Sequence, residues 1–164
     1  MKTLYMIGGT MGVGKTTICQ QLKNTLPQSV FLDGDWCWDA NPFLITEETK
    51  AMVIDNICYL LNNFMRCSAY DNVVFGWVMH EQTIIDSVIE RLDLQAYTTK
   101  CISLVVNESE LRNRLAQDIQ AGIRNESVVQ RSIERLPMYQ NLNTIKIDTS
   151  NKSIQTIVKE IIEC

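Results

Sequence analysis

Gly9-Thr10-Met11-Gly12-Val13-Gly14-Lys15-Thr16 is the stretch that decides the fold. It follows the buried-strand pattern Leu4-Tyr5-Met6-Ile7 and precedes a helical pattern that begins at Thr17. The spacing G-x-x-x-x-G-K-[ST] between a strand and a helix is typical of a loop that wraps phosphate groups. Glycines let backbone N–H groups approach phosphate oxygens, and the helix N-terminus adds donors and partial positive charge. A chance glycine-rich turn is the alternative, but the flanking strand and helix favour the phosphate loop.

The positions of this loop have expected parts in binding a nucleoside triphosphate. Lys15 is expected to reach the β- and γ-phosphates and to act in catalysis, and the Thr16 hydroxyl is expected to bind Mg²⁺. The surrounding phosphate cradle comprises Gly9, Thr10, Met11, Gly12, Val13, Gly14, Lys15, Thr16 and Thr17. The expected cofactors are therefore ATP and Mg²⁺.

The composition predicts one soluble globular domain over residues 1–164, with 46% hydrophobic and 21% charged residues. The net charge of −4 argues against a general nucleic-acid binder, which would favour a basic surface. Six cysteines without C-x-x-C spacing, and a single histidine, do not predict a zinc site. No signal peptide or membrane-spanning run is expected, so we expect a cytoplasmic protein with reduced cysteines.

Strand and helix patterns alternate along the chain. Strands are expected at residues 3–8, 30–32, 72–77, 101–106 and 144–148. Helices are expected at residues 15–26, 46–68, 81–92, from Ser109 towards Gly122, at 126–139 and from Ser153 onward. This alternation predicts an α/β domain with a mainly parallel sheet, whose ligands bind beyond the carboxyl ends of the strands.

Asp33 and Asp35 follow the second expected strand, at the same sheet edge as the phosphate loop. Two carboxylates there can divide two tasks, because one can hold Mg²⁺ while the other accepts the proton of an attacking hydroxyl. We assign Asp35 as the base and Asp33 to the Mg²⁺ shell, with the reverse order left open. A surface turn is the alternative, since Asp-Gly pairs commonly mark turns.

The loop from Gly9 to Thr16, the run Leu32-Asp33-Gly34-Asp35 and the arginine-rich residues 111–139 resemble the small phosphate-loop kinases. That group includes adenylate, shikimate and adenylylsulfate kinases and chloramphenicol phosphotransferase. The resemblance covers nearly the whole chain and implies a P-loop NTPase fold, a three-layer α/β/α arrangement around a five-stranded parallel sheet of order 2-3-1-4-5. It also implies a short helical lid at about residues 118–128, and an aspartate that meets the substrate hydroxyl, here Asp35 or else Asp33.

The segment from Val73 to His80 is also weakly similar to tunicamycin-resistance-type proteins. It departs from many phosphate-loop proteins, because Val74-Phe75-Gly76-Trp77-Val78 has no acidic residue at the end of the third strand. Either Asp33 takes over that contact to Mg²⁺ or its water, or metal binding is weaker than in an active kinase.

Aromatic residues gather on the expected substrate side of the two aspartates, and they comprise Trp36, Trp38, Phe43 and Trp77. An aromatic pocket beside a general base suits a ring-bearing or partly apolar acceptor. Packing under the helix at 46–68 is the alternative for Trp36 and Trp38, and His80 is expected to be positional rather than catalytic. Arg66 is the only arginine between residues 36 and 70, which favours an uncharged or weakly charged acceptor over a nucleoside monophosphate.

Residues 111–139 carry five arginines, a residue type that suits bidentate contacts to phosphate oxygens. The resemblance implies that a lid supplies such contacts, and we expect them from Arg114, Arg124 and Arg131. Arg124, at the expected lid tip, is also expected to act in catalysis. The alternative is a solvated helix face paired with Glu110, Asp118 and Glu134, which we expect for Arg112 and Arg135.

Asp148-Thr149-Ser150 follows the last expected strand. It resembles the loop that packs against the adenine in these kinases, so Thr149 joins the expected nucleotide-binding residues. A plain helix cap is the alternative.

The favoured function is an ATP-dependent phosphotransferase that moves the γ-phosphate to a hydroxyl of a nucleoside-, metabolite- or antibiotic-like small molecule. The first alternative is a polynucleotide 5′-hydroxyl kinase, which would need a basic track for the strand. The second is an ATP-binding regulator or resistance protein without rapid phosphate transfer, which the missing acid after the third strand supports. The expected partners are a nucleoside triphosphate and a small-molecule acceptor, without nucleic acid or membrane.

Overall fold

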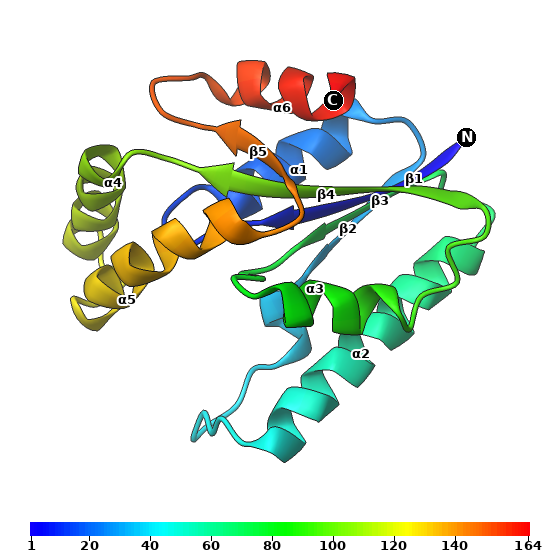
Figure 1. Ribbon diagram of the computed structural model, residues 1–164, viewed down its shortest axis with the longest axis horizontal. Helices are drawn as coiled ribbons and strands as arrows, with labels where there is room; N and C mark the ends of the chain where they lie inside the picture. The colour runs from blue at the N-terminus through cyan, green and yellow to red at the C-terminus, as the bar shows by residue number, and fades with distance from the viewer.

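The computed structural model describes residues 1–164 as a parallel sheet that is covered by helices on both faces (Figure 1). The strands are β1 (Lys2–Gly8), β2 (Ser29–Asp33), β3 (Asn72–Gly76), β4 (Tyr97–Val105) and β5 (Ile145–Asp148). They form one sheet of order β2-β3-β1-β4-β5, and each neighbouring pair is parallel. The predicted α/β fold and its strand order are confirmed.

The central strand β1 is buried on both faces. Tyr5 and Ile7 pack into one core layer, and Leu4 and Met6 pack into the other. Successive side chains of a strand point to opposite faces, so an unbroken apolar run is what a strand with two covered faces requires. This arrangement places the loop after β1 at the middle of the sheet edge.

Six α-helices and two 3₁₀ helices surround the sheet. They are α1 (Lys15–Thr25), η1 (Gly34–Cys37), α2 (Glu47–Arg66), α3 (Gln82–Ile89), α4 (Glu108–Gln120), α5 (Ser127–Arg135), η2 (Leu136–Asn141) and α6 (Ile154–Glu163). The core layer with α1, α4 and α6 lies on one face, and the layer with α2 and α3 lies on the other. No helix combines the length and the apolar character that crossing a lipid bilayer would require.

Three α-helices begin with a side-chain cap. Thr46, Asn107 and Ser153 each accept a hydrogen bond from the backbone N–H three residues ahead. The predicted starts near residues 46 and 153 are confirmed, but the predicted cap at Ser109 was wrong, because Asn107 holds that position.

Two other predicted boundaries also differ from the structure. β4 begins at Tyr97, earlier than predicted, because it pairs with β1 from Lys2 onward. The helix predicted over residues 126–139 divides after Arg135, and the 3₁₀ turn η2 carries Pro137 near its start. Proline lacks the N–H that a continuing α-helix needs.

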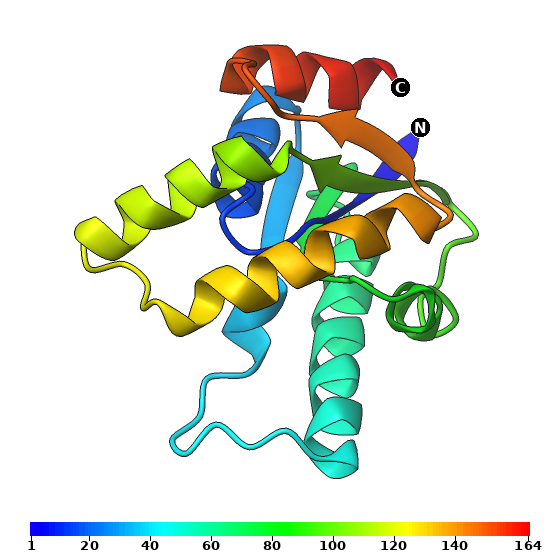
Figure 2. The same ribbon diagram turned by 60° about the vertical axis from the view of Figure 1, so that its left-hand side comes forward.

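An arm formed by α4 and α5 projects from the sheet edge beyond the strands' carboxyl ends (Figure 2). The turn between the two helices, residues 121–126, is the tip of the arm. The segment from η1 to the start of α2 leaves the same edge, and Figure 2 shows it below the arm.

Candidate functional site

The loop between β1 and α1 leaves the first turn of α1 open. Gly14 caps this helix in the left-handed region at φ 100°, no side chain caps it, and its first turn holds no acidic residue. The first N–H groups of an α-helix have no partner within the helix. Because Gly14, Lys15, Thr16 and Thr17 also line a cavity, the open end of α1 is suited to bind an anion.

Gly12 is required where α4 packs on this loop. Its φ is 85°, and an added Cβ would lie 2.6 Å from Cδ2 of Leu115. A larger residue would combine a strained backbone with a steric overlap. The close packing of α4 therefore restricts the conformation of the loop at Gly12.

Lys15 folds back onto the loop. Its ammonium group donates to the carbonyl oxygens of Gly9 at 2.6 Å and Thr10 at 3.0 Å. Burial lowers the pKa of Lys15 to about 8, although the charge of Asp35 acts in the opposite direction. A phosphate group at this position would supply the full negative charge that the backbone carbonyls do not.

Asp33 joins the loop to the end of β2. Its Oδ2 accepts from the Thr16 hydroxyl at 3.2 Å, and its Oδ1 accepts from the backbone N–H of Asp35 at 3.0 Å. Asp33 is buried and caps η1. The run Asp33-Gly34-Asp35 is therefore the start of a 3₁₀ helix beside the phosphate loop, and the surface-turn alternative does not describe it.

Asp35 lies in the cavity wall, with one side still open to solvent. Partial burial raises its pKa, and the charge of Asp33 raises it further. The charge of Lys15, the polar edge of the Trp77 indole and the charge of Arg124 oppose that rise in pKa. The environment therefore makes Asp35 a stronger base than an exposed carboxylate.

Trp77 reaches Asp35 because Gly34 lacks a side chain. An added Cβ on Gly34 would lie 2.4 Å from Cγ of Trp77. The indole thus packs on the backbone of η1. This contact holds the aromatic ring next to the carboxylate.

The end of β3 has no room for an acidic side chain. Gly76 pairs in register with Asp33 of the neighbouring strand. An added Cβ on Gly76 would lie 2.9 Å from Sγ of Cys19 and 3.4 Å from the ring of Phe31. Asp33 is the carboxylate available at this part of the sheet edge.

Arg114 connects three segments of the chain. Its guanidinium donates to the Val13 carbonyl at 3.0 Å, to the Thr149 carbonyl at 3.1 Å and to the Thr149 hydroxyl at 3.2 Å. It also pairs with Glu110, whose second oxygen accepts from the N–H of Asn151 at 3.0 Å. Arg114 lines the cavity and at the same time holds the loop after β5 against the phosphate loop.

The other arginines divide between the cavity and the surface. Arg124 lines the cavity and donates to Asp118 at 2.9 Å. Arg112 pairs with Glu108 on an exposed face. This is the solvated helix face that the alternative predicts, although the partner is Glu108 and not one of the carboxylates that were expected. Arg131 is exposed and does not line the cavity.

Ser132 is a site-building residue that sequence reasoning missed. The Thr10 hydroxyl donates to the Ser132 carbonyl at 2.7 Å, the two hydroxyls lie 2.9 Å apart, and the Ser132 hydroxyl donates to the Met11 carbonyl. Both side chains are completely buried. Its helical spacing could have indicated its burial. Ser132 lies four residues after Val128 and three after Val129, which places it on the apolar face of α5.

One cavity of about 360 Å³ brings most of the predicted residues together. Those that line it are Met11, Gly12, Gly14, Lys15, Thr16, Thr17, Asp33, Asp35, Arg114 and Arg124. Lining residues that were not predicted for the site are Phe31, Gly76, Gln117, Asp118 and Ile123. Predicted residues outside the lining are Gly9, Thr10, Val13, Arg131 and Thr149, of which Thr10, Val13 and Thr149 support it from beneath. His80 does not line the cavity either, and its buried Nδ1 has no hydrogen-bond partner.

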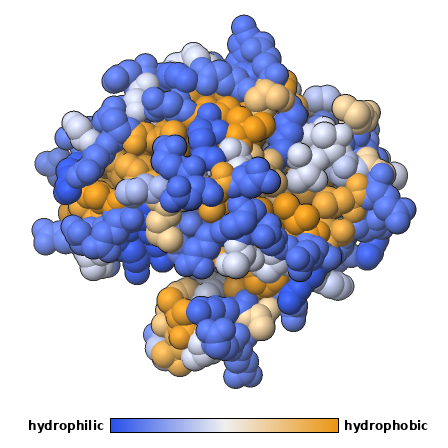
Figure 3. All heavy atoms as spheres, viewed as in Figure 1, coloured by the Kyte–Doolittle hydropathy of each residue, from blue (hydrophilic) through white to orange (hydrophobic).

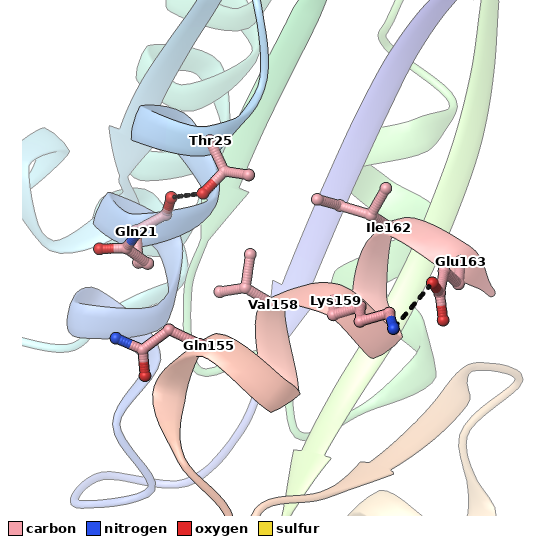
Figure 4. A pocket seen from close by; sticks show the side chains of 7 residues that line it. All are labelled: Gln21, Thr25, Gln155, Val158, Lys159, Ile162 and Glu163. Atoms are coloured by element: carbon pink, nitrogen blue, oxygen red, sulfur yellow. Dashed lines mark hydrogen bonds and ion pairs between the residues drawn. The ribbon is translucent and has the colours of Figure 1, made fainter.

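A second hollow, of about 280 Å³, lies between α1 and α6 (Figure 4). Its lining comprises Gln21, Thr25, Gln155, Val158, Lys159, Ile162 and Glu163. The charged side chains there, Lys159 and Glu163, pair with each other at 3.7 Å along α6. The hollow holds none of the predicted site residues, so the cavity at the phosphate loop is the candidate site.

Comparisons with solved structures find the same fold over nearly the whole chain. A gluconokinase from Sinorhizobium meliloti 1021 is 18% identical and has a TM-score of 0.69, with 98% of this chain and 90% of that one covered. The tunicamycin resistance protein of Deinococcus radiodurans is 18% identical with a TM-score of 0.75, covering 99% and 95%. Shikimate kinase from Aquifex aeolicus VF5 is 16% identical with a TM-score of 0.58, covering 98% and 94%.

The sequence comparisons identify the family of this chain. No curated protein matches this chain in sequence. The family described as "AAA domain" matches residues 6–133, which include the phosphate loop, both aspartates and most of the arm. The chain therefore belongs to this AAA-domain family and has the fold of the small phosphate-loop kinases.

Proposed function

We propose that this protein transfers the γ-phosphate of ATP to a hydroxyl group of a small molecule. The observation that carries the proposal is the position of Asp35. This carboxylate shares one cavity with Lys15 and the open end of α1, and its pKa is raised by burial and by Asp33. A base that faces a phosphate-binding loop is the arrangement that phosphate transfer to a hydroxyl requires.

Lys15 and the N–H groups of the loop would hold the triphosphate, and Arg124 would stabilise the charge that develops on the transferred group. Asp35 would orient the acceptor hydroxyl and take its proton. We also propose that Arg131 and Thr149 help to bind the nucleotide. Arg131 would act from the exposed face of α5, and Thr149 would act through its contact with Arg114. We further propose that residues 1–164 act as one unit, with residues 118–128 as the lid.

The residues present fit a magnesium ion that is shared with phosphates. No group of three or more His, Cys, Asp or Glu side chains is placed to hold a metal by itself. Mg²⁺ at phosphates commonly takes only one or two protein oxygens and keeps several waters. The Thr16 hydroxyl and Asp33, 3.2 Å apart, would supply those oxygens, and the ion would neutralise charge on the β- and γ-phosphates.

A coupled assay of ADP release tests this proposal, with Mg²⁺ and a panel that includes gluconate, shikimate, nucleosides and tunicamycin. We expect one acceptor class to stimulate ADP release. Asp35→Asn should lower that stimulated rate about 10²- to 10⁴-fold, the usual contribution of a general base, while ATP binding persists. Asp93→Asn is the matched control, because Asp93 is exposed, does not line the cavity and lies in the loop before β4. Equal stimulated rates in Asp35→Asn and the wild type would contradict the proposed base.

One observation favours a second candidate, an ATP-binding regulator without rapid transfer. The end of β3 carries Gly76, which has no room for an acidic side chain. If the protein binds ATP and an acceptor but releases no ADP with any of them, the regulator becomes the better description.

A further inference from the structure

Two exposed apolar segments, which we call lips, adjoin residues of the cavity lining: one follows Asp35 in sequence, and the other is the tip of the arm. We call residues 36–46 the acceptor lip; within it Trp36, Phe43, Leu44 and Ile45 have 60%, 54%, 58% and 64% of their surface exposed. The opposite lip is the tip of the arm, where Ile123 lines the cavity and is 69% exposed. Figure 3 shows hydrophobic side chains gathered on the projecting lobe where Figure 1 places the acceptor lip.

The acceptor lip is an ordered structure. The rings of Trp38 and Phe43 pack with centroids 4.3 Å apart, and Asn56 of α2 donates to the Cys37 carbonyl at 3.0 Å. Thr49 donates to the Leu44 carbonyl at 2.9 Å. These contacts hold the exposed side chains in place without covering them.

The apolar surface of this lip continues into the cavity. Phe31 forms part of the cavity wall, and the Trp36 ring meets it edge-on with centroids 5.2 Å apart. Trp36 in turn follows Asp35 directly in sequence. A molecule whose hydroxyl reaches Asp35 would therefore extend over Phe31 and Trp36.

Residues 29–82, on the side of Asp35, offer no free cation to a negatively charged molecule, and Arg124 across the cavity pairs with Asp118. Between residues 29 and 82 the lysines and arginines are Lys50 and Arg66 alone. Lys50 pairs with Glu47 at 3.0 Å, and Arg66 lies about 24 Å further along α2 at 1.5 Å per residue. The carboxylates nearby in sequence are Asp33, Asp35, Asp39, Glu47 and Glu48. A carboxylate or phosphate on the acceptor would meet like charge there.

We propose that the acceptor carries no negative charge and has an apolar body that packs between the acceptor lip and Ile123. This inference rests on the proposed phosphotransferase function, because it places the acceptor hydroxyl at Asp35. Covering the exposed side chains of both lips removes apolar surface from water, which is the driving force for binding. A membrane surface is the competing occupant, and vesicle co-sedimentation separates it from a small molecule.

A series of alkyl β-D-glucosides tests the apolar body. Calorimetric titration of methyl, butyl, hexyl and octyl glucoside, below micelle-forming concentrations and with Mg²⁺ and a non-hydrolysable ATP analogue, measures binding without transfer. Affinity should rise about tenfold for every two methylenes buried. Octyl glucuronide, with the same tail and a carboxylate, should bind at least about tenfold more weakly than octyl glucoside. Affinity that is independent of chain length, or a preference for the glucuronide, would overturn the proposal.

A double variant of the acceptor lip tests the location. Leu44→Ser with Ile45→Ser should weaken binding of octyl glucoside about tenfold and leave methyl glucoside and the ATP analogue unaffected. Ile154→Ser is the control, because Ile154 is an exposed residue at the start of α6 and does not line the cavity. Equal loss in the control, or none in the double variant, would contradict the assignment.

Two further readouts separate the outcomes. Lip-dependent co-sedimentation with phosphatidylcholine vesicles, without chain-length-dependent glucoside binding, would assign the lips to a membrane and overturn the proposal. If ADP release fails with every acceptor while glucosides bind through the lip, the phosphotransferase function fails and the preference of the lips for an apolar molecule still stands.

Discussion

The two sides of the cavity are built in opposite ways. On the nucleotide side, the buried Thr10 and Ser132 join the phosphate loop to the arm, and the half-buried Arg114 joins it to the loop after β5. On the acceptor side, the lip exposes Leu44 and Ile45 to water. The nucleotide side is thus held in place by internal contacts, whereas the acceptor side keeps apolar surface that the proposed acceptor would cover. Preorganisation lowers the entropy lost on binding.

The largest expected effect lies where α4 packs on the phosphate loop. Gly12→Ala should destabilise the protein by about 3 kcal/mol, because it adds a positive-φ strain to an overlap with Leu115. Gly122→Ala isolates the strain, since Gly122 has φ 74° and an added Cβ would meet nothing within 4 Å. That control should lose about 1 kcal/mol in urea unfolding. Equal losses in the two variants would show that the packing of α4 contributes nothing to the rigidity of the nucleotide side.

Lys15 offers a test through pH. Its pKa is about 8 in the folded protein and about 10.4 in an unfolded chain. Between these values the unfolded state binds more protons, so the contribution of Lys15 to stability rises with pH and is lowest below pH 8. The stability of the wild type relative to Lys15→Met should therefore increase by on the order of 2 kcal/mol from pH 7 to pH 10. Thermal unfolding across this range measures it, and a constant difference would rule out the lowered pKa.

The contact between Thr10 and Ser132 tests how firmly the arm is held. Thr10→Val should destabilise by about 1.5 kcal/mol, because the buried Ser132 carbonyl loses the Thr10 hydroxyl that donates to it. The double variant with Ser132→Ala should lose less than the sum of the single changes, with a coupling of about 1 kcal/mol. Additive losses in urea unfolding would mean that the two hydroxyls act independently.

The smallest effect is expected on the acceptor lip. Leu44→Ser and Ile45→Ser should each change the free energy of unfolding by no more than about 0.5 kcal/mol, because both side chains are more than half exposed. A loss of about 2 kcal/mol in either variant would show that the lip is packed against the protein in solution. The contrast between the two sides of the cavity would then disappear.

Much of this architecture follows from local sequence signals. The phosphate loop, the apolar runs of the strands and the caps Thr46 and Ser153 each depend on short-range patterns, and the structure confirms them. The resemblance to small phosphate-loop kinases supplied the strand order, which alternation alone leaves open. Asp33 and Asp35 fall beside the loop because parallel strands end at one sheet edge.

The remaining features depend on contacts between distant segments. Ser132 meets Thr10 across 122 positions of the chain, and no local pattern encodes that pairing. Arg114 shows the same limit, because its spacing from Glu110 predicts an ion pair but not the bonds to Val13 and Thr149. β4 begins as early as Tyr97 because its first residues pair with β1. Those residues, 97–100, are mostly polar, so the sequence shows no apolar run that would predict a strand there.

The tight fit of Gly76 against Cys19 also has an evolutionary consequence. An aspartate at position 76 would force its Cβ to within 2.9 Å of the Cys19 sulfur, so the single substitution disrupts the core before it can help bind a metal. Replacing Cys19 with alanine first would open that space, but it would leave a void beneath the phosphate loop. Gly76 and Cys19 therefore constrain each other, and a lineage that carries this pair keeps the proposed metal-binding carboxylate on β2 unless both positions change together.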